Sequence, residues 1–339
     1  ESMVEEREVT PILKVEGLTK VFDQKAGKKR KSFKALDDVS FSVQPGKTLG
    51  IVGESGCGKS TLGRVILRLL EPTAGQAWLN GENIFQADPA CLKRLRRNMQ
   101  IIFQDPYASL DPRMTIGRII GEPNDPRMTI GRIIGEPIEI AGNVSSGECR
   151  EQVLKLMEIV GLDQQYYNRF PYEFSGGQRQ RVCIARALAL RPRLIVCDEP
   201  VSALDVSIQS QILNLLSRLQ EELSLTYLFI SHDLSVIRHI SDEICVMYLG
   251  RIVEFGKAED VYLHPLHPYT QCLLASVLPL VPNGRSGRGM VVQGEAVMPS
   301  EGGCPFYSRC PKAMDICKQT SPDMTCVEGR QVRCHLYNT

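Results

Sequence analysis

The sequence has almost no net charge and no long apolar run. Its 40 Lys and Arg residues nearly balance 39 Asp and Glu residues, which leaves a formal charge of +1. No overall field therefore draws the chain to nucleic acid or acidic lipid. No stretch approaches the roughly 20 apolar residues of a membrane span, and residues 1–8 are rich in acids, which argues against a secretory signal. We expect a cytosolic protein that reaches a membrane only through a partner.

The chain is long enough to bury a sizeable core. Its 339 residues, 43% hydrophobic and 23% charged, suit one large α/β domain with a smaller appendage, or two modest domains. In a cytosolic protein the 12 cysteines are interpreted as thiols or metal ligands before disulfides.

A glycine-rich stretch, residues 53–61, places a lysine and a hydroxyl at the spacing of a phosphate-binding loop. The apolar run 48–52 predicts a strand leading in, and 61–70 predicts a helix leading out. Glycines let backbone N–H groups and the helix N-terminus surround a phosphate chain. Lys59 would then reach the β- and γ-phosphates, and Ser60 would hold magnesium. The alternative, a glycine-rich turn with an exposed lysine, is the weaker interpretation.

Strands and helices are expected to alternate along most of the chain. Segment 11–22 suggests a strand and its return, and the basic stretch 25–34 is interpreted as a solvated loop, not a lipid or nucleic-acid patch. Further strands are expected at 35–43, 75–81, 99–103, 194–198 and 226–230, and helices at 91–97, 145–161, 175–190 and 206–223. This alternation is typical of a mostly parallel sheet covered on both faces. In such sheets ligands bind at the carboxyl ends of the strands.

One internal repeat is literal, because residues 111–123 recur as 125–137. Its period is too short for a solenoid unit, and two copies would not stack into a core. A tandem duplication that lengthens a surface segment and an error in the recorded sequence both remain open.

Two carboxylates, Asp198 and Glu199, follow an apolar strand. One carboxylate that holds a metal ion and a second that orients an attacking water are what a magnesium-nucleotide site needs. The pair is weak support alone and strong support beside a phosphate loop.

The run Ser175-Gly176-Gly177-Gln178, shortly before the Asp-Glu pair, completes a set of motifs that resembles the ATP-binding-cassette (ABC) ATPases. The resemblance implies an α/β fold: a P-loop ABC ATPase core with a mostly parallel sheet, an N-terminal antiparallel β-subdomain and a helical subdomain, plus a small Cys-rich C-terminal domain. It implies a nucleotide-binding domain over residues 11–258, with the helical subdomain at about 105–190, and a C-terminal domain over 259–339.

The resemblance also implies a role for each matching residue. The catalytic set is Lys59, Gln104, Glu199 and His232, and the magnesium set is Ser60, Gln104 and Asp198. The ATP-binding set is Phe22, Gly53, Ser55, Gly56, Gly58, Lys59, Ser60, Thr61, Ser175 and Gly177. For Phe22, simple core packing remains open as the alternative to stacking on adenine. For His232, its place after a strand outweighs the alternative of a core histidine.

A single set of motifs has a consequence for assembly. In the resembled family, the signature run of one subunit closes over the nucleotide on another. The chain is therefore expected to form a two-subunit sandwich, with Ser175 and Gly177 acting in trans.

Segments 104–115, 197–209 and 264–270 resemble the ATPases of bacterial dipeptide, oligopeptide and nickel permeases, in particular the F-type subunit. The resemblance implies a peptide importer at the cytoplasmic face of the cell membrane, with a D-type ATPase partner or a homodimer in isolation. It also implies two transmembrane permease subunits, an extracytoplasmic binding protein that acts indirectly, and no nucleic acid. The alternatives are a soluble ABC ATPase acting on nucleic acid or ribosomes, and a redox sensor with a vestigial cassette, which the intact Lys59 and Glu199 argue against.

Five of the cysteines lie between positions 304 and 334. A set of thiolates suits zinc or an iron–sulfur cluster, the lack of a C-x2-C pair disfavours a zinc ribbon, and unligated thiols remain an alternative. Peptide-permease ATPases have a similar tail, and some bind a [4Fe–4S] cluster there. The resemblance selects Cys304, Cys310, Cys317 and Cys334 as its ligands and leaves Cys326 as a spare. The implied cofactors are ATP, Mg²⁺ and this cluster.

Overall fold

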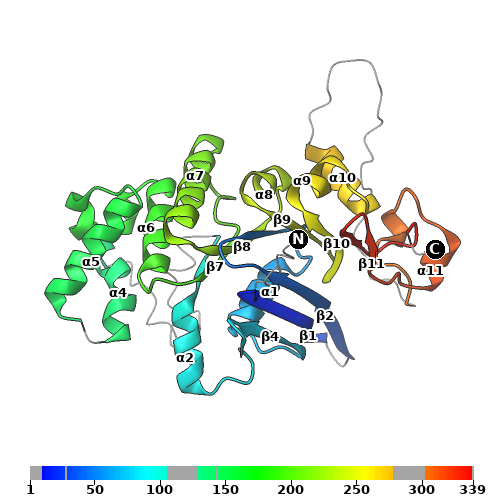
Figure 1. The fold of residues 1–339 in the computed structure, drawn as a ribbon, viewed down its shortest axis with the longest axis horizontal. Coiled ribbons are helices and arrows are strands. Elements are labelled where there is room, and N and C mark those ends of the chain that lie inside the picture. Colours follow the sequence, from blue (N-terminus) through cyan, green and yellow to red (C-terminus); the bar gives the residue numbers. More distant parts are fainter. Residues whose placement is uncertain (1–9, 27–28, 105–127, 143, 278–301, 338–339) are drawn as a thin grey trace, which may run out of the picture.

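The computed structural model describes residues 10–26, 29–104, 128–142, 144–277 and 302–337. These residues form two sheets, a group of helices beside the larger sheet, and a C-terminal region at its opposite end (Figure 1). The α/β class, the mostly parallel sheet and the N-terminal antiparallel subdomain expected from the sequence are confirmed.

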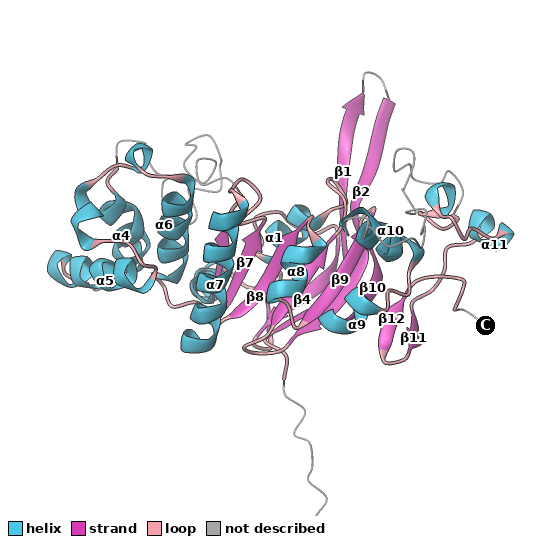
Figure 2. Ribbon diagram, turned by 90° about the horizontal axis from the view of Figure 1, so that it is seen from above, coloured by secondary structure: helices cyan, strands magenta, loops and turns pink. Residues whose placement is uncertain are grey.

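The smaller sheet is antiparallel, with strand order β2-β1-β4-β5. Its strands are β1 Leu13–Ala26, β2 Lys29–Val43, β4 Ala74–Leu79 and β5 Glu82–Asn83. The β1–β2 pair extends well beyond the rest of the sheet (Figure 2). The expected loop at 25–34 and the expected return within 11–22 were therefore wrong, because both stretches belong to one long hairpin whose register shifts at bulges.

The larger sheet has the order β11-β12-β10-β9-β3-β8-β7-β6. Its parallel strands are β3 Thr48–Val52, β6 Met99–Ile102, β7 Leu194–Asp198, β8 Thr226–Ser231 and β9 Glu243–Tyr248. Every residue of β3, β7 and β8 is buried, as expected for parallel strands covered on both faces. Their carboxyl ends lie along one edge of the sheet.

Helices cover the faces of this sheet, and some of them form a layer beside its edge. They are α1 Lys59–Ile66, α2 Pro89–Asn98, α4 Ile130–Ala141, α5 Ser146–Ile159, α6 Gly176–Leu188, α7 Val206–Leu223, α8 Leu234–Ile240, α9 Ala258–Leu263, α10 Pro268–Val277 and α11 Asp315–Gln319. Short 3₁₀ turns are formed by Gln164–Asn168, Pro171–Glu173 and Tyr307–Arg309. Helices α4, α5 and α6 form a layer at one end of the molecule (Figure 1), where their apolar faces join the main core.

The second copy of the duplicated segment contributes to α4. Ile130, Ile133, Ile134 and Ile138 of this helix are almost fully buried. This copy is therefore not a surface segment, because its isoleucines recur at helical spacing and pack into the core. The first copy, residues 111–123, lies outside the described residues.

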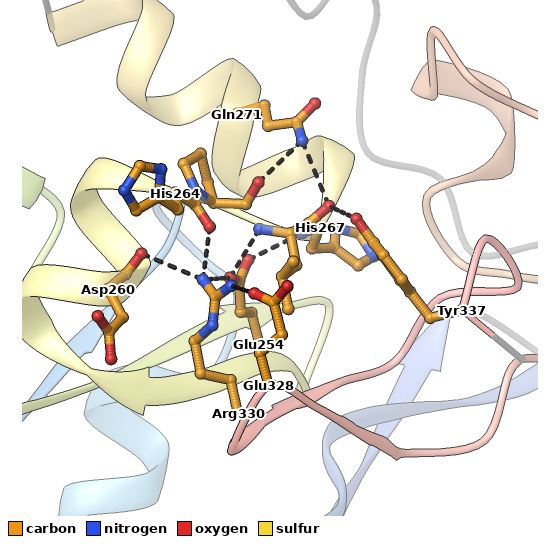
Figure 3. A network of polar contacts seen from close by, with 10 residues as sticks. Glu254, Asp260, His264, His267, Gln271, Glu328, Arg330 and Tyr337 are labelled. Carbon is orange, nitrogen blue, oxygen red and sulfur yellow. Dashed lines mark hydrogen bonds and ion pairs between the residues drawn. The ribbon is translucent and has the colours of Figure 1, made fainter.

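The C-terminal region extends the larger sheet. Strands β11 Thr325–Val327 and β12 Arg330–Val332 form a hairpin that pairs with β10 Arg251–Lys257. Arg330 fastens this hairpin, because its guanidinium donates to the carbonyls of Asp260 and His264 and lies 3.9 Å from buried Glu254 (Figure 3). Among the described residues, no helix has the length and apolar character needed to cross a bilayer.

Candidate functional site

The stretch between β3 and α1 has the backbone geometry of a phosphate-binding loop. Gly58 caps α1 with φ of 106°, and a Cβ there would lie 2.2 Å from the carbonyl oxygen of Ala35. A Cβ on Gly53 would lie 2.2 Å from the carbonyl oxygen of Met247. No side chain fits at either distance, so both positions require glycine. The loop is pressed against the core on one side and open on the other.

Lys59 begins α1 and turns back across its own loop. Its side chain is almost fully buried, and its Nζ donates to the carbonyl oxygens of Gly53 at 2.7 Å and Glu54 at 3.0 Å. The ammonium is thus held at the first turn of α1, where unpaired backbone N–H groups also favour an anion. This arrangement concentrates positive charge where a phosphate chain would lie.

Ser60 and Asp198 meet beside this lysine. The Ser60 hydroxyl donates to Asp198 Oδ1 at 2.7 Å, although the two residues come from α1 and the end of β7. Burial raises the pKa of the Asp198 carboxyl above its ordinary value, and the hydrogen bond from Ser60 partly opposes that shift. A hydroxyl and a carboxylate are the oxygen donors that Mg²⁺ takes beside phosphates, so these residues fit the ion expected from the sequence.

Glu199 is the centre of a three-residue contact at the carboxyl edge of the sheet. Its Oε2 accepts a hydrogen bond from Gln104 Nε2 at 3.2 Å and lies 3.1 Å from His232 Nδ1. The three residues follow β6, β7 and β8, which are neighbours in the sheet. Glu199 has φ of 50°, a left-handed backbone that is unfavourable for a glutamate and that aims its side chain at the other two.

Most of these groups line one cavity of about 470 Å³, whereas the predicted residues Gly53 and Asp198 lie outside its lining. Of the predicted residues, it is lined by Phe22, Ser55, Gly56, Gly58, Lys59, Ser60, Thr61, Gln104, Glu199 and His232. Phe33 and Ala35 also line it and were missed by the sequence reasoning. Phe33 lies opposite Phe22 in the β1–β2 register, so recognising the hairpin would have found it. The cavity therefore has a polar phosphate end and an aromatic end.

Ser175 and Gly177 are not among the residues that line this cavity. Ser175 caps α6 in a capping box with Gln178, and a Cβ on Gly177 would lie 2.5 Å from Ile208 Cγ2. The glycine is therefore required for close packing of α6 on α7. The structure holds the signature run at a helix N-terminus, apart from the nucleotide cavity of the same chain.

Four of the five tail cysteines share a cavity and the fifth does not. Cys304, Cys310, Cys317 and Cys334 line one small cavity, whereas Cys326 is exposed on β11. Burial raises the pKa of Cys304 and of Cys310 to about 11, so both are protonated at neutral pH. Within the described ranges, no group of three or more His, Cys, Asp or Glu residues is arranged to hold a metal ion. The thiols share a cavity without forming a preformed metal site.

The parallel sheet, the phosphate loop at its edge and the paired carboxylates define the class as an ATP-binding cassette protein. Residues 36–202 match the family model described as ABC transporter. The described fold is similar to a dimeric ATP-binding cassette in a post-hydrolysis state with ADP and Pi, with a TM-score of 0.61, 30% identity, and coverage of 73% of this chain and 98% of that one. It is also similar to a Clostridium perfringens component of an ABC transporter complex, with a TM-score of 0.62, 26% identity, and coverage of 75% and 91%.

Residues 253–317 match a second model, the C-terminal region of oligopeptide/dipeptide transporters. The chain is 47% identical over 335 residues to a dipeptide transport ATP-binding protein of Haemophilus influenzae, covering 97% of this chain and 98% of that protein. It is 48% identical over 335 residues to an oligopeptide transport ATP-binding protein of Bacillus subtilis, with coverage of 96% and 98%. The chain belongs to the ATP-binding proteins of the ABC oligopeptide/dipeptide transporter family and is an ATPase. The alternative of an ABC ATPase that acts on nucleic acid is not supported.

Proposed function

We propose that this chain is the ATP-hydrolysing subunit of a binding-protein-dependent importer of dipeptides or oligopeptides. The observation that carries the proposal is the contact of Glu199 with Gln104 and His232 at the edge of the phosphate-loop cavity. The printed functions of the relatives, dipeptide and oligopeptide transport, supply the class of solute.

The cavity supports a role for each residue in hydrolysis. Lys59 and the N–H groups of α1 bind the β- and γ-phosphates, and the aromatic end formed by Phe22 and Phe33 takes the adenine. Glu199 orients the attacking water and accepts its proton, while His232 contacts the γ-phosphate. Ser60, Asp198 and Gln104 would hold Mg²⁺, which would supply charge neutralisation for the phosphates.

Gln104 connects this chemistry to the partners. It precedes the segment that starts at residue 105, which lies outside the described residues and contains the sequence that resembles the membrane-gripping region of permease ATPases. Its contact with Glu199 gives the catalytic carboxylate a direct link to that segment.

We also propose that the active form is a dimer. Ser175 and Gly177 of one subunit complete the site of another, which is supported by their absence from the lining of their own cavity and by the dimeric state of a similar solved cassette. In the cell the partner would be a related D-type ATPase, and the pair would bind two transmembrane subunits at the cytoplasmic face of the membrane, with a binding protein acting outside. The proposed domains are residues 11–258, with the helical subdomain at about 105–190, and 259–339.

The test of the catalytic assignment is Glu199→Gln, compared with Glu221→Gln on the exposed face of α7 as the matched control. Loss of the general base is expected to lower turnover at least about 100-fold, and the nucleotide-bound dimer should persist in size-exclusion chromatography. The control should hydrolyse ATP as the wild type does. Undiminished turnover by the Glu199 variant would remove Glu199 from the mechanism.

The test of transport uses proteoliposomes that contain the membrane subunits, the partner ATPase and the binding protein. Labelled dipeptide should accumulate only with ATP and only with an intact Lys59. Purification from cells distinguishes the rival function, because nucleic acid bound in place of membrane subunits would contradict the importer.

We further propose a [4Fe–4S] cluster on Cys304, Cys310, Cys317 and Cys334, supported by their shared cavity and by the family resemblance. The described thiols would have to move together to bind iron, because they form no preformed site. After anaerobic purification, iron, sulfide and visible absorbance should be lost in Cys304→Ser and retained in Cys326→Ser. Wild-type protein that is colourless and free of iron would refute the cluster.

A further inference from the structure

The C-terminal region contacts the phosphate loop directly, through a residue that is itself part of that loop. The Glu54 carboxylate accepts two hydrogen bonds from Arg309, from Nη1 at 2.8 Å and from Nη2 at 2.9 Å. The backbone N–H of Glu54 donates to the hydroxyl of Tyr269 at 2.8 Å. Both the side chain and the backbone of one loop residue are therefore held by residues more than 200 positions further along the chain.

Arg309 is fixed in place on its other faces. Its side chain is only 7% exposed, its Nη1 also donates to the Tyr248 hydroxyl at 3.2 Å, and its guanidinium lies 5.8 Å from the centre of that ring. Tyr248, Tyr269 and Phe306 pack against one another with ring centres 4.7 to 5.4 Å apart and are 0–1% exposed. The bidentate, charge-assisted pair of Arg309 with Glu54 rests on a buried cluster of aromatic rings, so the contact is rigid and its direction is fixed.

The position of Arg309 depends on the tail, and that of Tyr269 on the turn before α10. Phe306 and the 3₁₀ turn Tyr307–Arg309 lie between Cys304 and Cys310 in the chain, and Phe306 lines the cysteine cavity. Before α10, buried Glu254 accepts from the N–H groups of Leu266 and His267, both at 2.9 Å (Figure 3). His267 Nδ1 in turn accepts from the N–H of Tyr269 at 3.0 Å. Two separately anchored segments thus converge on Glu54.

We propose that Arg309 is a positioning residue for ATP binding, and that the C-terminal region holds the phosphate loop in its binding conformation by its hold on Glu54. This rests on the function proposed for the loop at Lys59. Glu54 does not line the nucleotide cavity in the described structure, so Arg309 acts on the nucleotide only through the loop. If the loop is in its binding conformation only part of the time, the apparent dissociation constant for ATP equals the intrinsic constant divided by the fraction of loops in that conformation.

The signature of this role is a change in affinity without a change in chemistry. Once ATP is bound, its own contacts hold the loop, so the step at Glu199 proceeds as before. Arg309→Ala is expected to raise KM and Kd for ATP about tenfold, a change that corresponds to about 1.4 kcal/mol, and to leave kcat within about twofold. Arg309→Lys keeps the charge but loses the bidentate geometry, so its KM and Kd for ATP should lie between those of the wild type and of Arg309→Ala.

The test measures steady-state ATP hydrolysis and equilibrium nucleotide binding on the full chain. Lys312→Ala is the matched control, because it removes a cation from the same segment. The Lys312 ammonium donates to Gln271 at 3.0 Å and does not contact the phosphate loop. The exchanged pair Glu54→Arg with Arg309→Glu should recover much of the affinity that each single variant loses. Melting temperatures of all variants show whether the tail is still folded.

Each result decides the proposal. A folded Arg309→Ala protein with wild-type KM, or an equal rise in KM for Lys312→Ala, would overturn it, as would a fall in kcat at unchanged KM. If the phosphate loop at Lys59 is not the ATP site, the result is different, because the Lys59→Ala protein would then still bind ATP.

Discussion

The buried guanidinium of Arg330 gives the sharpest stability prediction. Arg330 is 4% exposed, and Arg330→Ala removes donors to the carbonyls of Asp260 and His264 and the cation 3.9 Å from Glu254. Glu254 is 0% exposed and would remain as a buried acid without a cation. Breaking a buried pair in this way destabilises proteins by about 3–5 kcal/mol, and the two unpaired carbonyls place the loss toward the upper end of that range. We expect a loss of about 3–5 kcal/mol.

The matched control is Arg94→Ala. Arg94 also pairs with a glutamate, Glu82, but the two side chains are 63% and 45% exposed, so solvent screens the pair and the expected loss is much smaller. Urea unfolding followed by circular dichroism measures the global loss, and hydrogen exchange of β10 and β12 measures local opening. An Arg330→Ala protein within about 1 kcal/mol of wild type in both measurements would refute the argument from burial.

Three further predictions concern the nucleotide site and its surroundings. Lys59→Ala should lower ATP turnover at least about 100-fold, because a preorganised cation is lost from the phosphates; undiminished turnover would exclude the loop as the ATP site. Burial lowers the pKa of His267 to about 3, so the unfolded chain takes up a proton that the folded chain excludes, and stability should fall as pH drops from about 6.5 toward 3, by at most about 1.4 kcal/mol per pH unit. Urea midpoints of wild type and His267→Asn measured over that range should converge as the pH falls, and parallel curves would contradict the assignment. Burial also raises the pKa of Cys57, so iodoacetamide at neutral pH should label exposed Cys326 and leave Cys57 unlabelled in mass spectra of the folded protein; early labelling of Cys57 would show that the loop opens readily.

The sequence predicted the parts of the site whose geometry is local. Gly53 and Gly58 belong to a motif whose spacing is local in the chain, although the carbonyl oxygens that exclude a side chain there come from Met247 and Ala35. The strand-end positions of Glu199 and His232 follow from the parallel sheet. The long β1–β2 hairpin was missed because its basic residues have the composition of a loop, and with it Phe33 was missed as part of the cavity. Charge composition alone does not report a strand that pairs along its whole length.

The hold on Glu54 was missed for a different reason, since it depends on contacts between residues far apart in the chain. Arg309, Tyr269 and Glu54 each have an ordinary local context, and they are brought together by packing between distant segments, including that of Tyr248 with Phe306. In the sequence, segment 264–270 indicated only a resemblance to permease ATPases and no structural role. The structure gives it a physical purpose, because its turn is anchored on Glu254 and directs Tyr269 to the loop.

This arrangement explains why the C-terminal region would matter to an ATPase whose catalytic groups all lie elsewhere. The match to the oligopeptide/dipeptide C-terminal model spans residues 253–317, and Glu254, His267, Tyr269 and Arg309 all lie inside it. The phosphate loop lies instead within the match to the general ABC model, residues 36–202. The contact at Glu54 therefore joins the part of the chain typical of peptide transporters to the part typical of all cassettes. If Arg309 sets ATP affinity, a change in the thiol-lined cavity beside Phe306 would reach the nucleotide by a path of direct contacts, without any movement of the catalytic edge.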